Sequence, residues 1–141
     1  MKKEPTVPAN ISALIPPAQL DFIKTNKNDL ETVTDLVKNQ LKICPDMKET
    51  DDDLNTLPVI FHYYYGASEF FICKYDRKDH MFGYGIINGD VKSSEFGFFS
   101  LKQLMAIPGL QLNFSNKEKT IEDALKKSYP KDYKKMLAGS I

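Results

Sequence analysis

Two histidines and two aspartates are the residues of this chain best suited to acid–base or metal chemistry. His62 lies in an aromatic run, whereas Asp76, Asp79 and His80 share one short polar segment. Imidazole and carboxylate groups bind divalent metals and transfer protons near neutral pH. These four residues define one hypothesis, a small metal-dependent hydrolase-like enzyme.

The motifs that usually accompany such chemistry are missing from the sequence. No HExxH motif and no paired Cys/His spacing is present, and Cys44 and Cys73 are the only cysteines. No serine lies in a GxSxG context, and Gly83-Tyr84-Gly85 lacks the third glycine of a dinucleotide-binding loop. We therefore expect no cofactor and no metal, and the sequence favours a protein without a catalytic centre.

Aromatic residues supply a second hypothesis. Twelve of the sixteen aromatic residues fall between Phe61 and Phe99, where five glycines interrupt them. Exposed rings next to Lys74, Arg77 and Lys78 would stack on single-stranded nucleic acid. Against this, 19 basic residues balance 19 acidic ones, and Arg77 is the only arginine. Nucleic-acid binding is thus a second alternative and is not favoured.

A protein partner is the hypothesis that the residues favour. Successive strand residues point to opposite faces, so we expect some rings of the Tyr63–Tyr65 run to enter the core and at least one to meet solvent. Arg77 and His80 lie in a polar segment that also favours exposure. We take Tyr64, Arg77 and His80 as the candidate partner-binding residues of a non-enzymatic accessory protein.

The elements that position these residues are mainly strands. Strand-favouring rings at period two, separated by glycines and polar turns, predict strands over 59–65, 69–75, 81–87 and 95–99, paired in sequence. Alternation over 110–114 predicts a fifth strand at an edge. The fold class is therefore α+β, a central antiparallel meander of four to five strands with flanking N- and C-terminal helices.

Capping residues predict where the helices begin. Pro17 opens a helix to about Lys24, and Asn28 caps a longer amphipathic one that ends at Cys44-Pro45. Ser100 caps a helix with Gln103 as its reciprocal partner, and Thr120 starts another. A last helical segment covers about 131–138, after Pro130.

Length and composition are those of one globular domain. The 141 residues are 42% hydrophobic and 27% charged, with a net charge of zero, and they suggest no membrane association. Residues 1–10 are expected to form a flexible arm. Met1-Lys2-Lys3 is followed by Glu4 and Pro5 rather than by a long apolar run, so we expect a cytoplasmic protein. The 46–53 segment is strongly acidic.

Four motifs in order carry a family resemblance: Pro58–His62, Phe71–Asp76, Met81–Gly85 and Glu95–Leu101. Over about residues 57–114 the chain resembles the bacterial family called domain of unknown function 2958. That family typically continues with a Glu-Arg-Asp triplet in its next strand, where this chain has Gln111-Leu112-Asn113. The resemblance implies a bacterial mobile element or phage as the setting, and no established catalytic residue.

Overall fold

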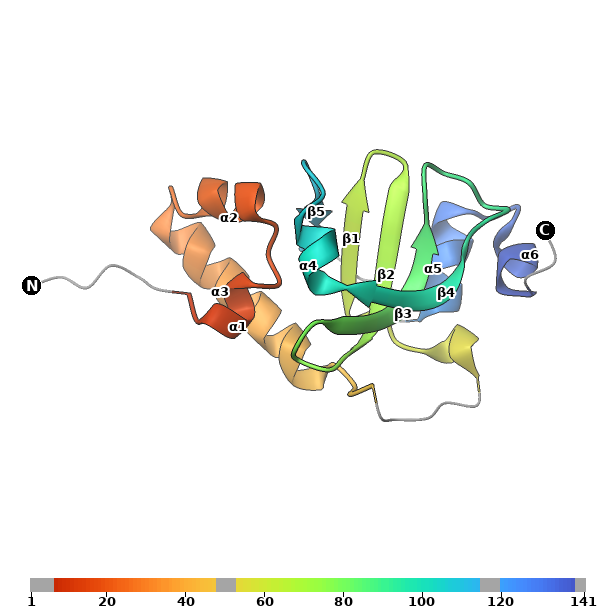
Figure 1. Cartoon of the computed structure of the whole chain (residues 1–141), viewed down its shortest axis with the longest axis horizontal. Coiled ribbons are helices and arrows are strands. Elements are labelled where there is room, and N and C mark those ends of the chain that lie inside the picture. Colours follow the sequence, from red (N-terminus) through yellow and green to blue (C-terminus); the bar gives the residue numbers. More distant parts are fainter. Residues whose placement is uncertain (1–6, 48–52, 115–119, 139–141) are drawn as a thin grey trace, which may run out of the picture.

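The computed structural model describes residues 7–47, 53–114 and 120–138, and it has the expected α+β fold (Figure 1). A five-stranded antiparallel sheet lies between N-terminal and C-terminal helices. The elements are α1 (Ala9–Ser12), α2 (Pro17–Ile23), α3 (Lys27–Ile43), the 3-10 helix η1 (Leu54–Thr56), β1 (Phe61–Tyr65), β2 (Ser68–Tyr75), β3 (His80–Ile86), β4 (Glu95–Ser100), α4 (Leu101–Met105), β5 (Gln111–Leu112), α5 (Ile121–Ser128) and α6 (Tyr133–Ala138).

The sheet confirms the predicted meander. Its strand order is β4-β3-β2-β1-β5, so four consecutive strands pair with their neighbours and β5 returns to pair with β1. Tyr65 lies opposite Ser68, which leaves Gly66 and Ala67 as the two turn residues of the first hairpin. Only Gly66 of these two has a positive φ, +55°, as a type II′ turn requires.

A β-bulge in β2 explains one of the glycines in β3. The register shifts between Ile72 and Lys74, so Cys73 has no opposite residue. A Cβ atom added to Gly83 would lie 1.9 Å from the carbonyl oxygen of Phe71. Only glycine therefore fits at this point of β3.

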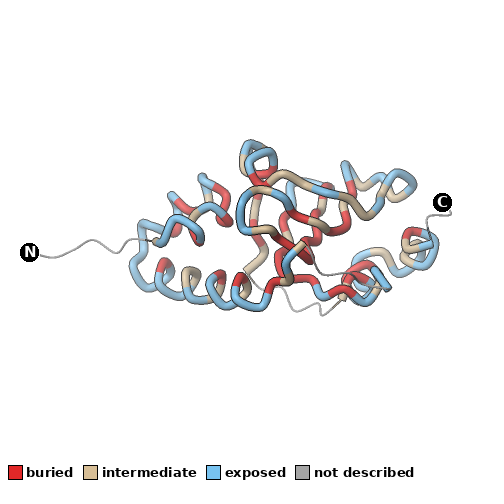
Figure 2. Tube along the Cα trace, turned by 60° about the horizontal axis from the view of Figure 1, so that its bottom comes forward, coloured by how far each residue is buried: buried red, intermediate tan, exposed pale blue. Residues whose placement is uncertain are grey.

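Both faces of the sheet are apolar, and each is covered by a different set of helices. One face packs on α1–α3 and α4, and the other on α5 and α6. Figure 1 shows α1–α3 toward one end of the molecule, α5 and α6 toward the other, and α4 near the middle, and Figure 2 shows the buried residues concentrated in the strands. The first core contains Ile11, Leu14, Leu30, Val37, Phe61, Tyr63, Phe70, Ile72, Met81 and Leu104, and the second Phe71, Cys73, Tyr84, Ile86, Ile121, Leu125 and Met136.

The helix caps agree with the sequence predictions at two positions and differ at a third. The Ser100 hydroxyl accepts from the N–H of Gln103, and that of Thr120 from the N–H of Asp123. The cap of α3 is Asn26 rather than Asn28, because the Asn26 side chain accepts from the N–H groups of residues 28 and 29. Two asparagines lie close together there, and the one with extended backbone becomes the cap.

The predicted N-terminal arm and acidic segment lie only partly in the described ranges. Residues 1–6 and 48–52 are outside them, and α1 begins already at Ala9, within the predicted arm. Across the described ranges no helix has the length and apolar character needed to cross a membrane.

Tyr63 of β1 connects the sheet to the N-terminal helices. Its fully buried hydroxyl donates to the backbone carbonyl of Leu14 at 2.6 Å. Burial raises the pKa of this phenol well above its usual value of 10.0, so the group is a neutral donor. The bond satisfies a carbonyl just after α1 that packing has removed from water.

We expect Tyr63→Phe to lower the free energy of unfolding by about 1–3 kcal/mol, because the Leu14 carbonyl would stay buried without this donor. Tyr65→Phe is the matched control, since Tyr65 is 50% exposed. Urea unfolding of both variants measures the difference. Equal effects of the two substitutions would contradict this role for the Tyr63 hydroxyl.

Candidate functional site

Arg77 is one of the three predicted partner contacts, but its guanidinium group donates hydrogen bonds to backbone carbonyls of the same chain. One nitrogen donates to the carbonyls of Leu41 and Cys44 at 3.0 and 2.6 Å, and the other donates to the carbonyl of Tyr75 at 2.9 Å. Leu41 lies in the last turn of α3, and Cys44 is its C-cap. Arg77 therefore satisfies carbonyls at the end of this helix, where positive charge is favourable.

The loop between β2 and β3 is organised by the Asp76 carboxylate. One oxygen accepts from the N–H groups of Lys78, Asp79 and His80 at 2.8–3.0 Å, and the other from Nδ1 of His80 at 3.0 Å. Burial raises the pKa of Asp76, but these hydrogen bonds outweigh it and lower the pKa to about 2. The loop thus holds an ionised carboxylate, with the side chain of His80 71% exposed beside it.

Asp79 of the same loop supports the start of α4. Its carboxylate accepts from the Ser100 hydroxyl at 2.7 Å and from the N–H of Lys102 at 2.9 Å, and these bonds, the first being the larger effect, lower its pKa. Its backbone carbonyl accepts from the N–H of Leu101. Asp79 is therefore occupied with helix capping.

His62 lies in a different cluster from the other three residues of the enzyme hypothesis. Its Nε2 donates to Glu69 at 3.2 Å and its Nδ1 accepts from the amide of Asn113 at 3.2 Å, while the ring stacks on Phe71. Tyr129 donates to the second Glu69 oxygen at 2.7 Å. With both ring nitrogens occupied, His62 joins β1, β2 and the segments after β5 and α5.

Sheet register separates His62 from the Asp76–His80 loop. His62 lies opposite Phe71 and Phe71 opposite Tyr84, four residues along β3 from His80. Four strand residues span roughly 13 Å, before the two strand spacings are added. Within the described ranges no three His, Cys, Asp or Glu residues are grouped as metal ligands. The structure does not bring the four residues of the hypothesis together.

Tyr64 is 39% exposed, and its partners on the neighbouring strands are Glu69 and Gln111 rather than basic residues. It lies opposite Glu69, and β2 runs five residues from there to Lys74, which is itself buried. Arg77 is committed to the end of α3. The rings and the basic residues proposed to hold single-stranded nucleic acid therefore occupy different parts of the sheet.

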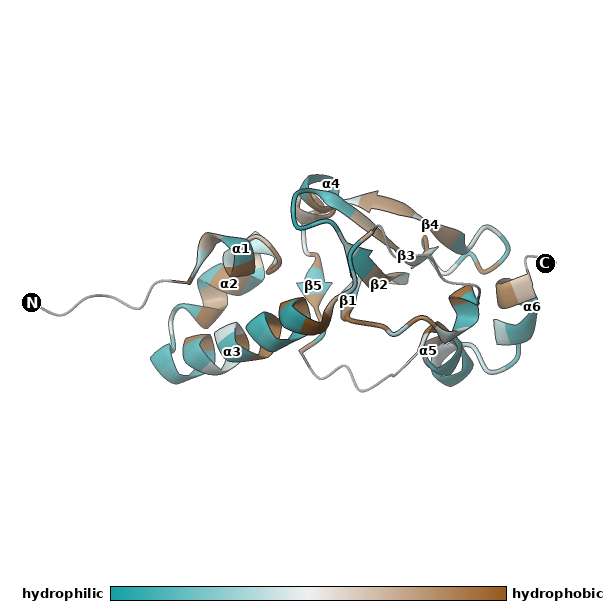
Figure 3. Ribbon diagram, turned by 90° about the horizontal axis from the view of Figure 1, so that it is seen from below, coloured by the Kyte–Doolittle hydropathy of each residue, from teal (hydrophilic) through white to brown (hydrophobic). Residues whose placement is uncertain are grey.

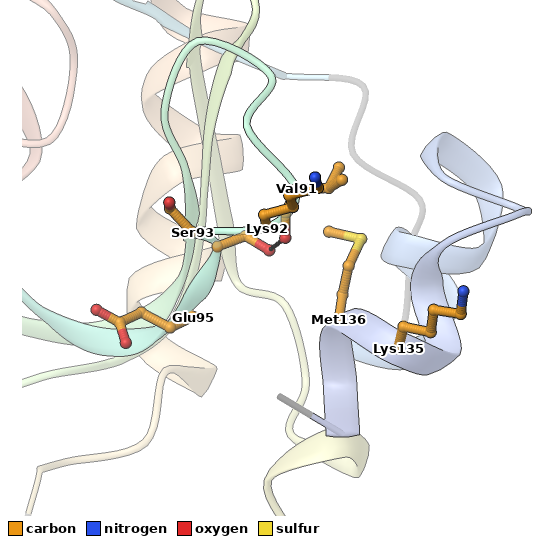
Figure 4. A pocket seen from close by; sticks show the side chains of 7 residues that line it. Val91, Lys92, Ser93, Glu95, Lys135 and Met136 are labelled. Carbon is orange, nitrogen blue, oxygen red and sulfur yellow. Dashed lines mark hydrogen bonds between the residues drawn. The ribbon is translucent and has the colours of Figure 1, made fainter. Parts of the chain in front are cut away.

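A small cavity of about 180 Å³ lies between α6 and the segment before β4. Figure 4 shows Met136 pointing across it, while the charged ends of Glu95 and Lys135 point in different directions. The Ser94 hydroxyl already pairs with Tyr84 and with the Val91 carbonyl. The polar groups around this cavity do not converge on a common point.

The most exposed ring of the sheet is Phe98, in the edge strand β4. Its exposure is 73%, and Figure 3 shows β4 as a largely hydrophobic ribbon at the border of the sheet. A mainly apolar hollow of about 270 Å³ and a smaller one of about 120 Å³, which Lys74 also lines, lie on either side of it. Ile87, Phe99, Leu104 and Ile107 are among the residues that line the larger hollow, and Met47, Leu54 and Phe82 among those that line the smaller one.

The direction of the β4 backbone groups follows from the sheet register. The carbonyl of His80 accepts from Asp76 and so faces β2, which makes Met81 face β4 and pair with Phe99. Phe99 therefore directs its N–H and C=O inward. Its neighbour Phe98 and, by the same alternation, Phe96 direct theirs away from the sheet.

The two edges of the sheet differ in whether another group pairs with the backbone of the edge strand. At the β5 edge, the Gln19 side chain pairs with the N–H and C=O of Leu112 at 2.8 and 3.0 Å, as a strand would. In the part of the chain that the structure describes, no strand pairs with the outer edge of β4. We call Phe96–Ser100 with its two hollows the β4 edge, and it is the candidate functional site.

Sequence reasoning named Tyr64, Arg77 and His80 and missed Phe98 and the Glu69–Asn113–Tyr129 cluster. The exposure of Phe98 could have been predicted, because the last strand of a meander is an edge strand and its side chains have a neighbouring strand on one side only. The position of Glu69 near His62 also follows from the two-residue hairpin, which fixes the register. No comparable signal in the sequence linked Arg77 to α3.

We expect Arg77→Lys to lower the free energy of unfolding by about 1–3 kcal/mol, because a lysine keeps the charge but cannot reach both carbonyls as a planar fork does. Lys78→Arg, at an exposed neighbour, is the control. Denaturant unfolding distinguishes the two. Unchanged stability in Arg77→Lys would contradict the capping role.

We also expect Asp76→Asn to flatten the acid dependence of stability. Folding lowers the pKa of Asp76 from 3.8 to about 2. The ionised carboxylate therefore stabilises the fold at pH values above 3.8, the pKa in the unfolded chain, and this stabilisation is lost as the pH falls toward 2. The free energy of unfolding of the wild type should therefore fall more steeply than that of the variant over this interval. Parallel curves would show that Asp76 is not linked to folding.

Comparisons with known proteins add no relative: no family model, no curated protein and no solved structure matches the chain. The resemblance drawn from the aromatic and glycine motifs stays a prediction.

Proposed function

We propose that this chain is a non-enzymatic accessory protein that binds another protein through the β4 edge. The observation that carries the proposal is an edge strand with outward backbone groups, a ring that is 73% exposed and a hollow on each side, the larger one mainly apolar. A strand added to such an edge gains main-chain hydrogen bonds, and its alternate side chains enter pockets on the two faces.

The β4 strand lacks the features that usually protect a sheet edge, and this supports the assignment. Natural edge strands carry lysine, proline or a bulge that prevents pairing with other chains. Between Glu95 and Ser100 the sequence is Phe-Gly-Phe-Phe, and the register with β3 is regular. An edge of this kind is compatible with a soluble protein when a partner covers it.

The same reasoning disfavours the two alternatives. The hydrogen bonds of His62, Asp76 and Asp79 serve the fold, and the strand partners of the exposed Tyr64 and Tyr65 are Glu69, Gln111 and Ser68, none of them basic. A setting on a bacterial mobile element or in a phage belongs to the proposal and is based on the sequence resemblance alone. The cytoplasmic location also belongs to the proposal and is based on the residues that follow Met1-Lys2-Lys3.

Affinity capture from cells that express the protein tests the proposal. We expect proteins retained by the wild type to be lost with Phe98→Glu, because a charge would have to be buried in the new interface. Phe22→Glu is the matched control, since Phe22 is 77% exposed on α2.

The control variant should retain the same proteins as the wild type. If Phe98→Glu also retains them, the β4 edge is not the binding surface. If none of the three baits retains a protein specifically, protein binding itself is refuted as the function.

A further inference from the structure

We infer that the β4 edge also binds a second copy of this chain, forming a two-fold dimer in which two β4 strands pair antiparallel. The inference rests on the proposed function, because the second copy would occupy the same edge and a partner protein would have to displace it. The dimer would then regulate access to the binding surface.

The direction of the backbone groups selects a register. Phe96 and Phe98 direct their N–H and C=O groups outward, as derived from the Met81–Phe99 pairing. With the two-fold axis beside Phe98, the N–H and C=O of Phe98 bond to those of the same residue in the second copy. Phe96 then lies opposite Ser100 of the second copy, whose N–H points outward by the same alternation, while its C=O accepts the first intrahelical bond of α4.

Side chains on both faces fit this register. Phe98 lies on the same face as Phe96 and Phe82, and the axis would place the two exposed Phe98 rings side by side, an arrangement that stabilises strand pairs. On the other face Gly97 would lie opposite Phe99 of the second copy. A Cβ atom at Gly97 would have no atom within 4 Å, so the second copy meets open space there.

Charge is complementary at both ends of the paired strands. Glu95 and Lys102 are both exposed, one at the start of β4 and the other just after it. In the antiparallel register Glu95 lies opposite Leu101 of the second copy, next to Lys102. The two-fold axis creates this pair twice, and the net charge of zero means that two copies do not repel each other.

Sedimentation of the full chain over a wide concentration range tests the dimer. We expect the mass to rise from 16.1 kDa toward twice that value as concentration increases. Phe98→Pro should remain monomeric, because it removes an outward N–H and a ring without breaking a bond to β3. Phe22→Ser, which removes an equally exposed ring from α2, should dimerise like the wild type.

Disulfide trapping tests the register without relying on the stability of the proline variant. Phe98→Cys should crosslink rapidly under mild oxidation, because hydrogen-bonded antiparallel partners lie about 5.5 Å apart between Cα atoms, within the range of a disulfide. Phe96→Cys should crosslink slowly, since the register separates the two copies of that residue by roughly 14 Å.

A monomer at every concentration overturns the inference, and so does crosslinking at Phe96 that matches that at Phe98. The two proposals fail separately. A chain that stays monomeric but loses captured proteins on Phe98→Glu keeps the proposed function, whereas a dimer that captures nothing refutes that function and leaves the dimer.

Discussion

A sheet that is apolar on both faces is the constraint on which the rest of this structure depends. Phe61, Tyr63 and Ile72 point to one side, and Phe71 and Tyr84 to the other. Burial of such surfaces gives the largest favourable contribution to folding, so both sides need a helical cover. The N-terminal helices and α4 cover the first face and α5 and α6 the second, so helices are needed on both sides of the strands.

The need to hold helices against both faces also explains the hydrogen bonds of the polar residues. Arg77 closes the end of α3, Asp79 supports the start of α4, and the His62–Glu69 pair connects the sheet to Tyr129 after α5. Each of these groups fixes a helix or segment against the sheet. What the helices do not cover is the edge of β4, where an exposed ring and outward backbone groups remain available.

The strands and their order could be predicted from the sequence because alternating rings and glycine turns are local signals. The caps at Ser100 and Thr120 are local for the same reason. The roles of Arg77 and His62 could not be predicted, since their partners Leu41 and Asn113 are 36 and 51 residues away in the chain. Arg77 is exposed, but its residue type gives no sign that its guanidinium group bonds to the end of α3. Phe98 was overlooked because its exposure is decided by its position at an edge.

Residue-resolved amide hydrogen exchange tests most directly whether the β4 edge is a surface for strand addition. In dilute solution the amides of Phe96 and Phe98 should exchange fast and that of Phe99 slowly, because only the last donates into the sheet. At high concentration the Phe96 and Phe98 amides should become protected while exposed helix amides do not change. Exchange of Phe96 and Phe98 that stays fast at every concentration, and in the presence of captured proteins, would contradict the account.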